Sequence, residues 1–168
     1  DIDAKQDITA GGNLTSNNGD ITLDAGGSIM TNSTVNALNN VIANANGNIN
    51  TNGDVTATNG NAVLNSSAGS VTTKNVTAGQ AVDIDAANNI TANGSLTSYT
   101  ANVDLNAGGN VTTKNVTAGQ AVDIDAKQDI TANGSLTSTN ANVDLNAGGS
   151  ITTNGTVNAH DDVIANAN

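Results

Sequence analysis

The chain repeats three short islands of apolar and small residues, with polar residues at every second position. The clearest example reads VDIDA at 122–126, ITA at 130–132 and LTS at 136–138. A period of two places successive side chains on opposite faces of a strand, whereas a helix needs a period of about 3.6. Val, Ile and Thr favour strands, and the intervening Asn and Gly favour turns. The pattern predicts three short strands in each unit.

These units recur along the whole chain at a period of about 20 residues, which is typical of a repeat architecture. The stretch 72–86 returns unchanged as 112–126, so the best-kept copy is a pair of units. The first Val or Ile of the longest island recurs at nearly even steps, at Ile21, Val41, Val63, Val82, Val103, Val122, Val143 and Val163. The chain therefore holds about eight units.

One unit of three tiny strands buries very little, but a stack of similar units buries a continuous core. We therefore predict an all-β, three-faced parallel β-helix (β-solenoid) of about eight coils, with about 20 residues per coil. Val, Ile and Leu should fill the interior, and Ala, Ser and Thr should lie where the walls converge. We expect a right-handed coil from the general preference of parallel crossovers. Strands about 4.8 Å apart give a rod of about 40 Å.

All 168 residues are expected to form a single array. The chain begins inside one island and stops just after another. We therefore expect a fragment of a longer solenoid, and bare solenoid ends would favour end-to-end association because their strand edges are unpaired.

Two stretches fit the pattern less well than the others. Around 41–43 and 63–65 the second core position becomes Ala or Asn. Either the core is thinner there, or Ala62 and Leu64 point inward and the register shifts by one residue.

The composition narrows the range of partners. The net charge is -11, all 15 acidic residues are Asp, and the chain has no Cys, Pro, Trp or Phe. Such a charge disfavours nucleic acid and anionic membrane surfaces. No apolar run approaches the roughly 18 residues of a membrane helix. We therefore predict neither nucleic acid binding nor membrane insertion.

Tandem stretches such as GNLTSNNGDITLDAGGSIMTN (12–32) and GSLTSTNANVDLNAGGSITTNGTVNA (134–159) resemble the haemagglutinin repeats of filamentous haemagglutinin-type exoproteins. These are large surface proteins exported by two-partner secretion, and they include adhesins and the sticks of contact-dependent inhibition. The resemblance covers essentially all 168 residues. It implies a right-handed parallel β-helix shaft on the surface of a Gram-negative bacterium. The family's amino-terminal secretion domain and carboxy-terminal toxins have no counterpart in this sequence.

Stacking the first islands predicts an outward column of carboxylates. It comprises Asp83, Asp104, Asp123 and Asp144, flanked by Asp85, Asn106, Asp125 and Asn146. Carboxylate and amide oxygens are ligands of Ca²⁺. However, the spacing matches no calcium loop, and the GGxGxDx repeat of calcium-binding β-rolls is absent. We interpret the column as a solvated face, and we predict no metal site and no cofactor.

The second and third islands predict two outward columns of Thr. The first column contains Thr9, Thr72, Thr91, Thr112, Thr131 and Thr152; the second contains Thr15, Thr56, Thr77, Thr97, Thr117 and Thr137. Flat Thr arrays resemble ice-binding surfaces, but here Met30, Asn36, Asn50 and Asn158 interrupt them. We prefer the interpretation that β-branched polar residues suit exposed strands.

The remaining candidates for chemistry are isolated. Gly pairs at 11–12, 26–27, 108–109 and 148–149 lack the strand-to-helix context of a phosphate loop, so we interpret them as turn residues. His160 lies beside two carboxylates, and we interpret it as a corner residue rather than a metal ligand. The chain has no Arg, Glu or Cys and no visible nucleophile–base pair. We predict no catalytic residues and no enzyme.

The sequence thus predicts a structural shaft segment of a secreted bacterial adhesin-type exoprotein, which acts as a stiff spacer. The alternative is a direct adhesion module that binds host glycans or receptors through the outward polar ladders; ice binding is a third reading. One Tyr offers little aromatic surface for sugars. The expected partners are neighbouring coils of the parent chain and further copies end to end, and, in the alternative, a host cell surface or glycan.

Overall fold

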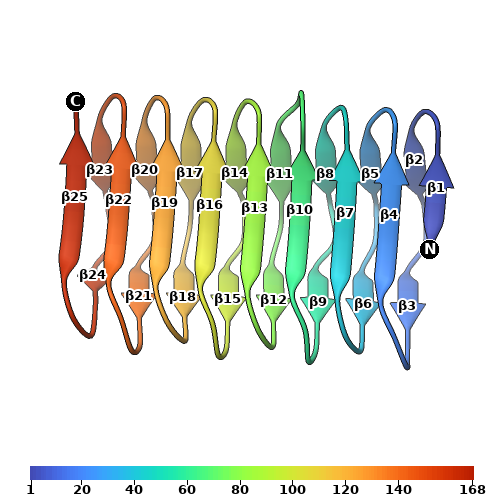
Figure 1. Cartoon of the computed structure of the whole chain (residues 1–168), viewed down its shortest axis with the longest axis horizontal. Coiled ribbons are helices and arrows are strands. Elements are labelled where there is room, and N and C mark those ends of the chain that lie inside the picture. The colour runs from blue at the N-terminus through green and yellow to red at the C-terminus, as the bar shows by residue number, and fades with distance from the viewer.

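The computed structural model describes all 168 residues and consists entirely of strands and turns. Short strands form three parallel sheets, and successive coils add one strand to each sheet (Figure 1). We call these sheets faces A, B and C. This confirms the predicted three-faced β-solenoid of about eight coils. No helix is present that is long and apolar enough to cross a membrane.

Face A has nine strands, of which all but the first contain five residues. They are β1 (Ile2–Ala4), β4 (Ile21–Ala25), β7 (Val41–Ala45), β10 (Ala62–Ser66), β13 (Val82–Ala86), β16 (Val103–Ala107), β19 (Val122–Ala126), β22 (Val143–Ala147) and β25 (Val163–Ala167).

Faces B and C have eight strands each, and these are shorter. Face B contains β2 (Ile8–Ala10), β5 (Ile29–Thr31), β8 (Ile49–Thr51), β11 (Val71–Thr73), β14 (Ile90–Ala92), β17 (Val111–Thr113), β20 (Ile130–Ala132) and β23 (Ile151–Thr153). Face C contains β3 (Leu14–Ser16), β6 (Val35–Ala37), β9 (Val55–Ala57), β12 (Val76–Ala78), β15 (Leu96–Ser98), β18 (Val116–Ala118), β21 (Leu136–Ser138) and β24 (Val157–Asn158).

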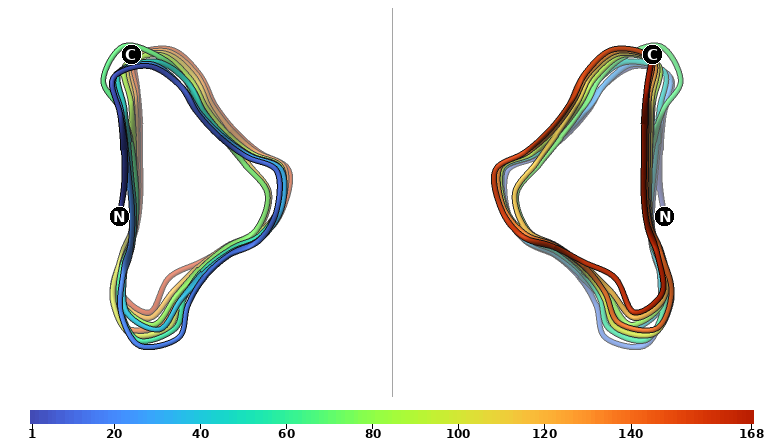
Figure 2. Two further views of the ribbon diagram at one scale, coloured as in Figure 1. Left: turned by 90° about the vertical axis from the view of Figure 1, so that its right-hand side faces the viewer. Right: turned by 90° about the vertical axis from the view of Figure 1, so that its left-hand side faces the viewer.

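The cross-section is a triangle whose longest side is face A (Figure 2). Seen from the N-terminal end, in the left view of Figure 2, the chain runs clockwise as it recedes, so the coil is right-handed as expected.

The interior is one apolar cluster that runs the length of the rod. It contains 39 buried residues, and the central coils bury their Val, Ile and Leu side chains almost completely. The predicted small residues lie at the strand ends, where Thr31, Ser66 and Thr73 are also buried. Because each side chain stacks on a similar one in the next coil, the core has no single centre.

The two irregular stretches have different explanations. In β7, Val41 and Ala43 point inward, so the core is thinner at Ala43. In β10 the inward residues are Ala62, Leu64 and Ser66, and Ala62 pairs with Val41. The assignment of Val63 to the start of this island is therefore wrong by one residue, because Val63 faces outward.

Unequal corners explain why shorter and longer coils alternate in the best-kept part of the repeat. The corner from face C to face A alternates between three residues (79–81) and four (99–102). The corner from face B to face C alternates between two residues (74–75) and three (93–95). The longer corners fall in the same coil.

A buried Ser closes several of the longer corners. The Ser98 hydroxyl lies 2.5 Å from the carbonyl oxygen of Gln80 in the preceding coil, and it accepts the Ala101 N–H at 3.2 Å. Ser138 makes the same pair of bonds with Gln120 and Ala141. Where the corner has only three residues, as after Ala78, Ala replaces Ser. The hydroxyl therefore satisfies a corner amide that has no other partner.

Candidate functional site

Face A carries two parallel columns of outward side chains, which are the most strongly charged feature of the rod. The first is the predicted Asp column, since Asp83, Asp104, Asp123 and Asp144 pair with one another across β13, β16, β19 and β22. Val63 and Ile164 occupy the adjoining positions of β10 and β25. Four carboxylates are thus stacked at the strand spacing between two apolar side chains.

This stacking makes the carboxylates harder to ionise. Partial burial raises the pKa of Asp123 to about 6, and the neighbouring carboxylates Asp104 and Asp144 add to the shift. Burial likewise raises the pKa values of Asp83 and Asp104 above the ordinary 3.8. The cause is the loss of hydration together with repulsion between like charges. The two inner carboxylates of the column, Asp104 and Asp123, each lie between two others.

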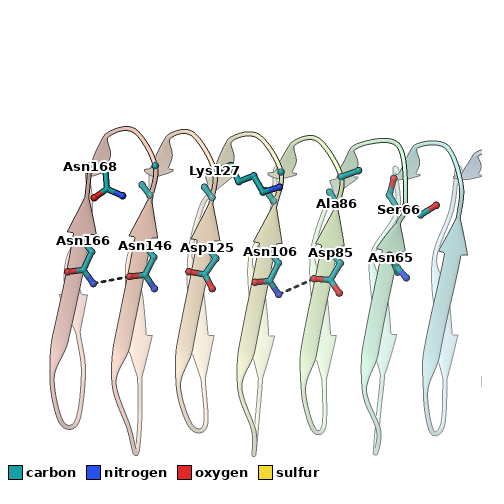
Figure 3. Close-up of a pocket in the computed structure, with 17 residues that line it drawn as sticks. Asn65, Ser66, Asp85, Ala86, Asn106, Asp125, Lys127, Asn146, Asn166 and Asn168 are labelled. Atoms are coloured by element: carbon teal, nitrogen blue, oxygen red, sulfur yellow. Dashed lines mark hydrogen bonds between the residues drawn. The ribbon is translucent and has the colours of Figure 1, made fainter.

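The second column alternates carboxylates with amides, and we call it the amide column. The Asn106 side-chain amide donates to Asp85 at 3.0 Å, and the Asn166 amide donates to Asn146 at 2.9 Å (Figure 3). Alternation of Asp with Asn replaces a carboxylate–carboxylate contact by a hydrogen bond. The two columns therefore differ although they share a face.

A shallow groove follows the amide column along the rod. Its volume is about 740 Å³, its floor includes Asp85, Asn106, Asp125 and Asn146, and Lys127 stands in the wall formed by the A-to-B corners (Figure 3). A second recess continues it past Asn65 toward the N-terminal coils. Sequence reasoning identified these flanking residues but not the groove, because the groove depends on how far the corner overhangs the strand.

The predicted Thr columns form on the other two faces. On face B, Thr72, Thr91, Thr112, Thr131 and Thr152 are paired in register. On face C, Thr56, Thr77, Thr97, Thr117 and Thr137 are paired likewise. Each strand of these faces offers one outward position, so each column is a single side chain wide. Thr9 pairs with Met30, and Thr15 pairs with Asn36, where the columns are interrupted as expected.

The isolated candidates lie at corners. His160 Nδ1 is 2.8 Å from Asp161 Oδ1, and both side chains are exposed. The Gly pairs occupy turns, and a Cβ on Gly108 would overlap the carbonyl oxygen of Ala87 in the preceding coil. No group of three or more His, Cys, Asp or Glu side chains is arranged to hold a metal ion.

A ladder along the A-to-B corner was missed by the sequence interpretation. From the first coil to the last, the residue before each face B strand accepts the backbone N–H of its counterpart in the next coil. The acceptors are Asp7, Ser28, Asn48, Ser70, Asn89, Asn110 and Asp129, and the last donor is Ser150. The signal was present, because the residue before each second island is always Asp, Asn or Ser. These bonds tie each corner to the next.

The fold and these ladders define a class of protein, the repetitive parallel β-solenoids whose coils bond only to their neighbours. Residues 110–162 match the family model described as the hemagglutinin repeat. These residues are thus similar to a hemagglutinin repeat and lie within the β-solenoid, which is consistent with a repeat segment of the filamentous haemagglutinin type. No curated protein and no solved structure matches the chain.

Proposed function

We propose that this chain is a stiff spacer within a secreted, adhesin-type exoprotein on the surface of a Gram-negative bacterium. The observation that carries the proposal is the continuity of all three sheets and of the apolar core through every coil. In such a rod each coil is held by parallel strand pairing on three sides and by packing in the middle. Bending the rod requires these contacts to be opened along one face.

In this proposal the outward columns keep the rod soluble and separate from other rods. The net charge of -11 supports that role, because like charges oppose lateral association. No residue acts as a catalyst, and the partners are the adjoining coils of the parent chain.

A second candidate is direct adhesion to host glycans or receptors through the outward ladders. The groove beside the amide column favours it, because hydroxyl groups of a ligand could bond to alternating carboxylates and amides there. The two candidates differ in whether the rod itself has a ligand.

Binding of the purified chain to a broad panel of glycans and host cells, with and without Ca²⁺, tests both candidates. The spacer proposal expects no saturable binding in either condition. Saturable binding that is lost when the outward Thr and Asn residues are scrambled, with the core unchanged, would replace the spacer by the adhesion module. A dependence on Ca²⁺ would direct mutagenesis to the Asp column.

A further inference from the structure

Seven Asn-Gly pairs lie in the corners of the rod, at 18–19, 46–47, 52–53, 59–60, 93–94, 133–134 and 154–155. In such a pair the glycine nitrogen can attack the asparagine side chain, since no Cβ on the glycine shields it. The attack needs a glycine N–H that is free of hydrogen bonds and an asparagine side chain that is free to rotate. The corners differ in both respects.

Asn93 meets both conditions. Its side chain is exposed and forms no hydrogen bond, and the Gly94 N–H has no acceptor. At Asn46, by contrast, the Gly47 N–H donates to the Gly27 carbonyl at 2.7 Å, and the Asn46 side chain accepts a bond from Ser67 at 3.1 Å. The same dipeptide is therefore free in one corner and held in another.

Asn133 provides a matched comparison. It lies in TANGSLTS at 131–138, which is identical to 91–98 around Asn93. Its exposure is similar and the Gly134 N–H also has no acceptor. However, the Asn133 side-chain carbonyl accepts the amide of Asn154 in the next coil at 3.0 Å. Asn93 has Lys114 at the equivalent position of its next coil, where Asn133 has Asn154.

The charges around the two sites also differ. Asn93 lies in the B-to-C corner between the coils that place Lys74 and Lys114 at the equivalent position. Asn133 has Lys114 on one side only and Asn154 on the other. Cations on both sides favour the anionic nitrogen that attacks, and this holds with the charge of Lys74 partly offset by Asp54, whose carboxylate lies 3.9 Å from the Lys74 ammonium. Both the freedom of the side chain and the local charge therefore favour Asn93.

We propose that Asn93 is a self-modification site of the folded rod, converted by its own backbone to aspartate and isoaspartate faster than Asn133. The Gly94 nitrogen loses its proton to hydroxide and bonds to Cγ of Asn93, the bond from Cγ to the side-chain nitrogen breaks, and ammonia leaves with a proton from water. Water then opens the cyclic imide at either carbonyl. The net reaction consumes one water, releases one ammonia and needs no oxidant or enzyme.

The product adds a carboxylate to a corner that already faces two lysines. Asn18 and Asn59 share the free side chain and the free glycine N–H, but both lie in corners from face C to face A without neighbouring lysines. Asn93 is therefore the site at which geometry and charge act together.

The test is incubation of the folded 168-residue chain in mildly alkaline buffer, followed by peptide mapping that quantifies aspartate and isoaspartate at each site over time. We expect conversion at Asn93 to be several-fold faster than at Asn133, with Asn46 slower than both. Equal rates at Asn93 and Asn133 in the folded chain would overturn the proposal, and so would no conversion at Asn93.

Two controls separate structure from local sequence. In the chain unfolded by urea, the rates at Asn93 and Asn133 should become similar, because their neighbours in sequence are identical. In the variant Asn154→Ala, the donor to Asn133 is lost, so conversion at Asn133 should rise toward that at Asn93 while Asn93 is unchanged. An unchanged rate at Asn133 in this variant would show that the bond from Asn154 does not control the reaction, which would overturn the structural basis of the proposal.

Discussion

Adjacent residues in this rod experience opposite environments, because the strand period is two. Val122 and Ile124 are fully buried, whereas Asp123 between them projects from face A beside other carboxylates. Inward positions therefore require apolar or small side chains, and outward positions accept charged ones. The effect of a substitution on stability should depend on which way the side chain points.

Two substitutions one residue apart test the assignment. Ile124→Asp places a charge in the dry core and should cost several kcal/mol of unfolding free energy. Asp123→Asn removes one of four stacked carboxylates and should be neutral or slightly stabilising, since an amide can donate to its neighbours. Urea denaturation of both variants and of the parent chain measures the difference. Equal destabilisation by the two changes would mean that the inward and outward faces are assigned wrongly.

The Asp column also predicts a pH dependence of opposite sign to that of a salt-bridged carboxylate. The pKa of Asp123 is about 6 in the folded chain and the ordinary value is 3.8, so the folded state binds the proton more tightly. The contribution of Asp123 to the free energy of unfolding should therefore be greatest below about pH 4. It should decline as the pH rises through about 6. The raised pKa values of Asp83 and Asp104 act in the same direction.

Urea midpoints measured across this pH range check the prediction. The decline should be shallower in Asp123→Asn and unchanged in Asp162→Asn, which alters an exposed corner outside the column. A parent chain that gains stability as the pH rises from about 4 to about 6 would contradict the prediction.

At the scale of elements, the corners determine the lengths of the coils. In three of the longer corners, Ser98, Ser138 and Ser66 accept a backbone N–H that has no other partner. The strands themselves are nearly invariant. Variation in coil length is therefore confined to the corners, and a buried hydroxyl accommodates the extra residue in these three, whereas the longer corner 93–95 follows Ala92 and has no such hydroxyl.

Ser98→Ala should test the role of this hydroxyl. The change leaves the Ala101 N–H and the Gln80 carbonyl without their bonds in a partly buried corner, and should cost about 1–3 kcal/mol. Ser95→Ala, a change of a nearby Ser whose hydroxyl forms no hydrogen bond, should stay within about 0.5 kcal/mol. Thermal or urea unfolding of the two variants provides the comparison. Equal losses would show that the Ser98 hydroxyl has no special part in the corner.

The strands, faces and outward columns could be predicted from sequence because each depends on a period of two within the longer period of the coil. The register of 62–66 could not, since AVLNS offers an apolar residue to either face. The structure selects the register that buries Ser66, whose hydroxyl bonds to Gly47 and Gly69. The groove and the A-to-B ladder depend on contacts between residues in successive coils, which strand periodicity does not encode.

At the scale of the whole molecule, the apolar column is open at both ends. Val163 in the last strand is 51% exposed, and Ile2 in the first strand is 41% exposed, although both occupy inward positions. The outer edges of β1 and β25 also lack a neighbouring strand. Such edges favour pairing with another chain.

We therefore expect copies of this chain to associate end to end. Sedimentation velocity over a wide concentration range should show longer species at high concentration, and Val163→Asp should shift the distribution back to monomer by placing a charge at the junction. A parent chain that stays monomeric throughout would contradict this expectation.

The alternation of long and short corners has a consequence for how such a rod can change its length. Loss or gain of a single coil would place two corners of the same length on top of each other, and it would disturb the bonds that Ser98 and Ser138 make to shorter corners below them. Loss or gain of two coils together keeps each longer corner next to a shorter one, as the identical stretches 72–86 and 112–126 illustrate. Unequal recombination within the gene could therefore lengthen or shorten the rod in steps of two coils, about 10 Å each, without requiring any compensating substitution.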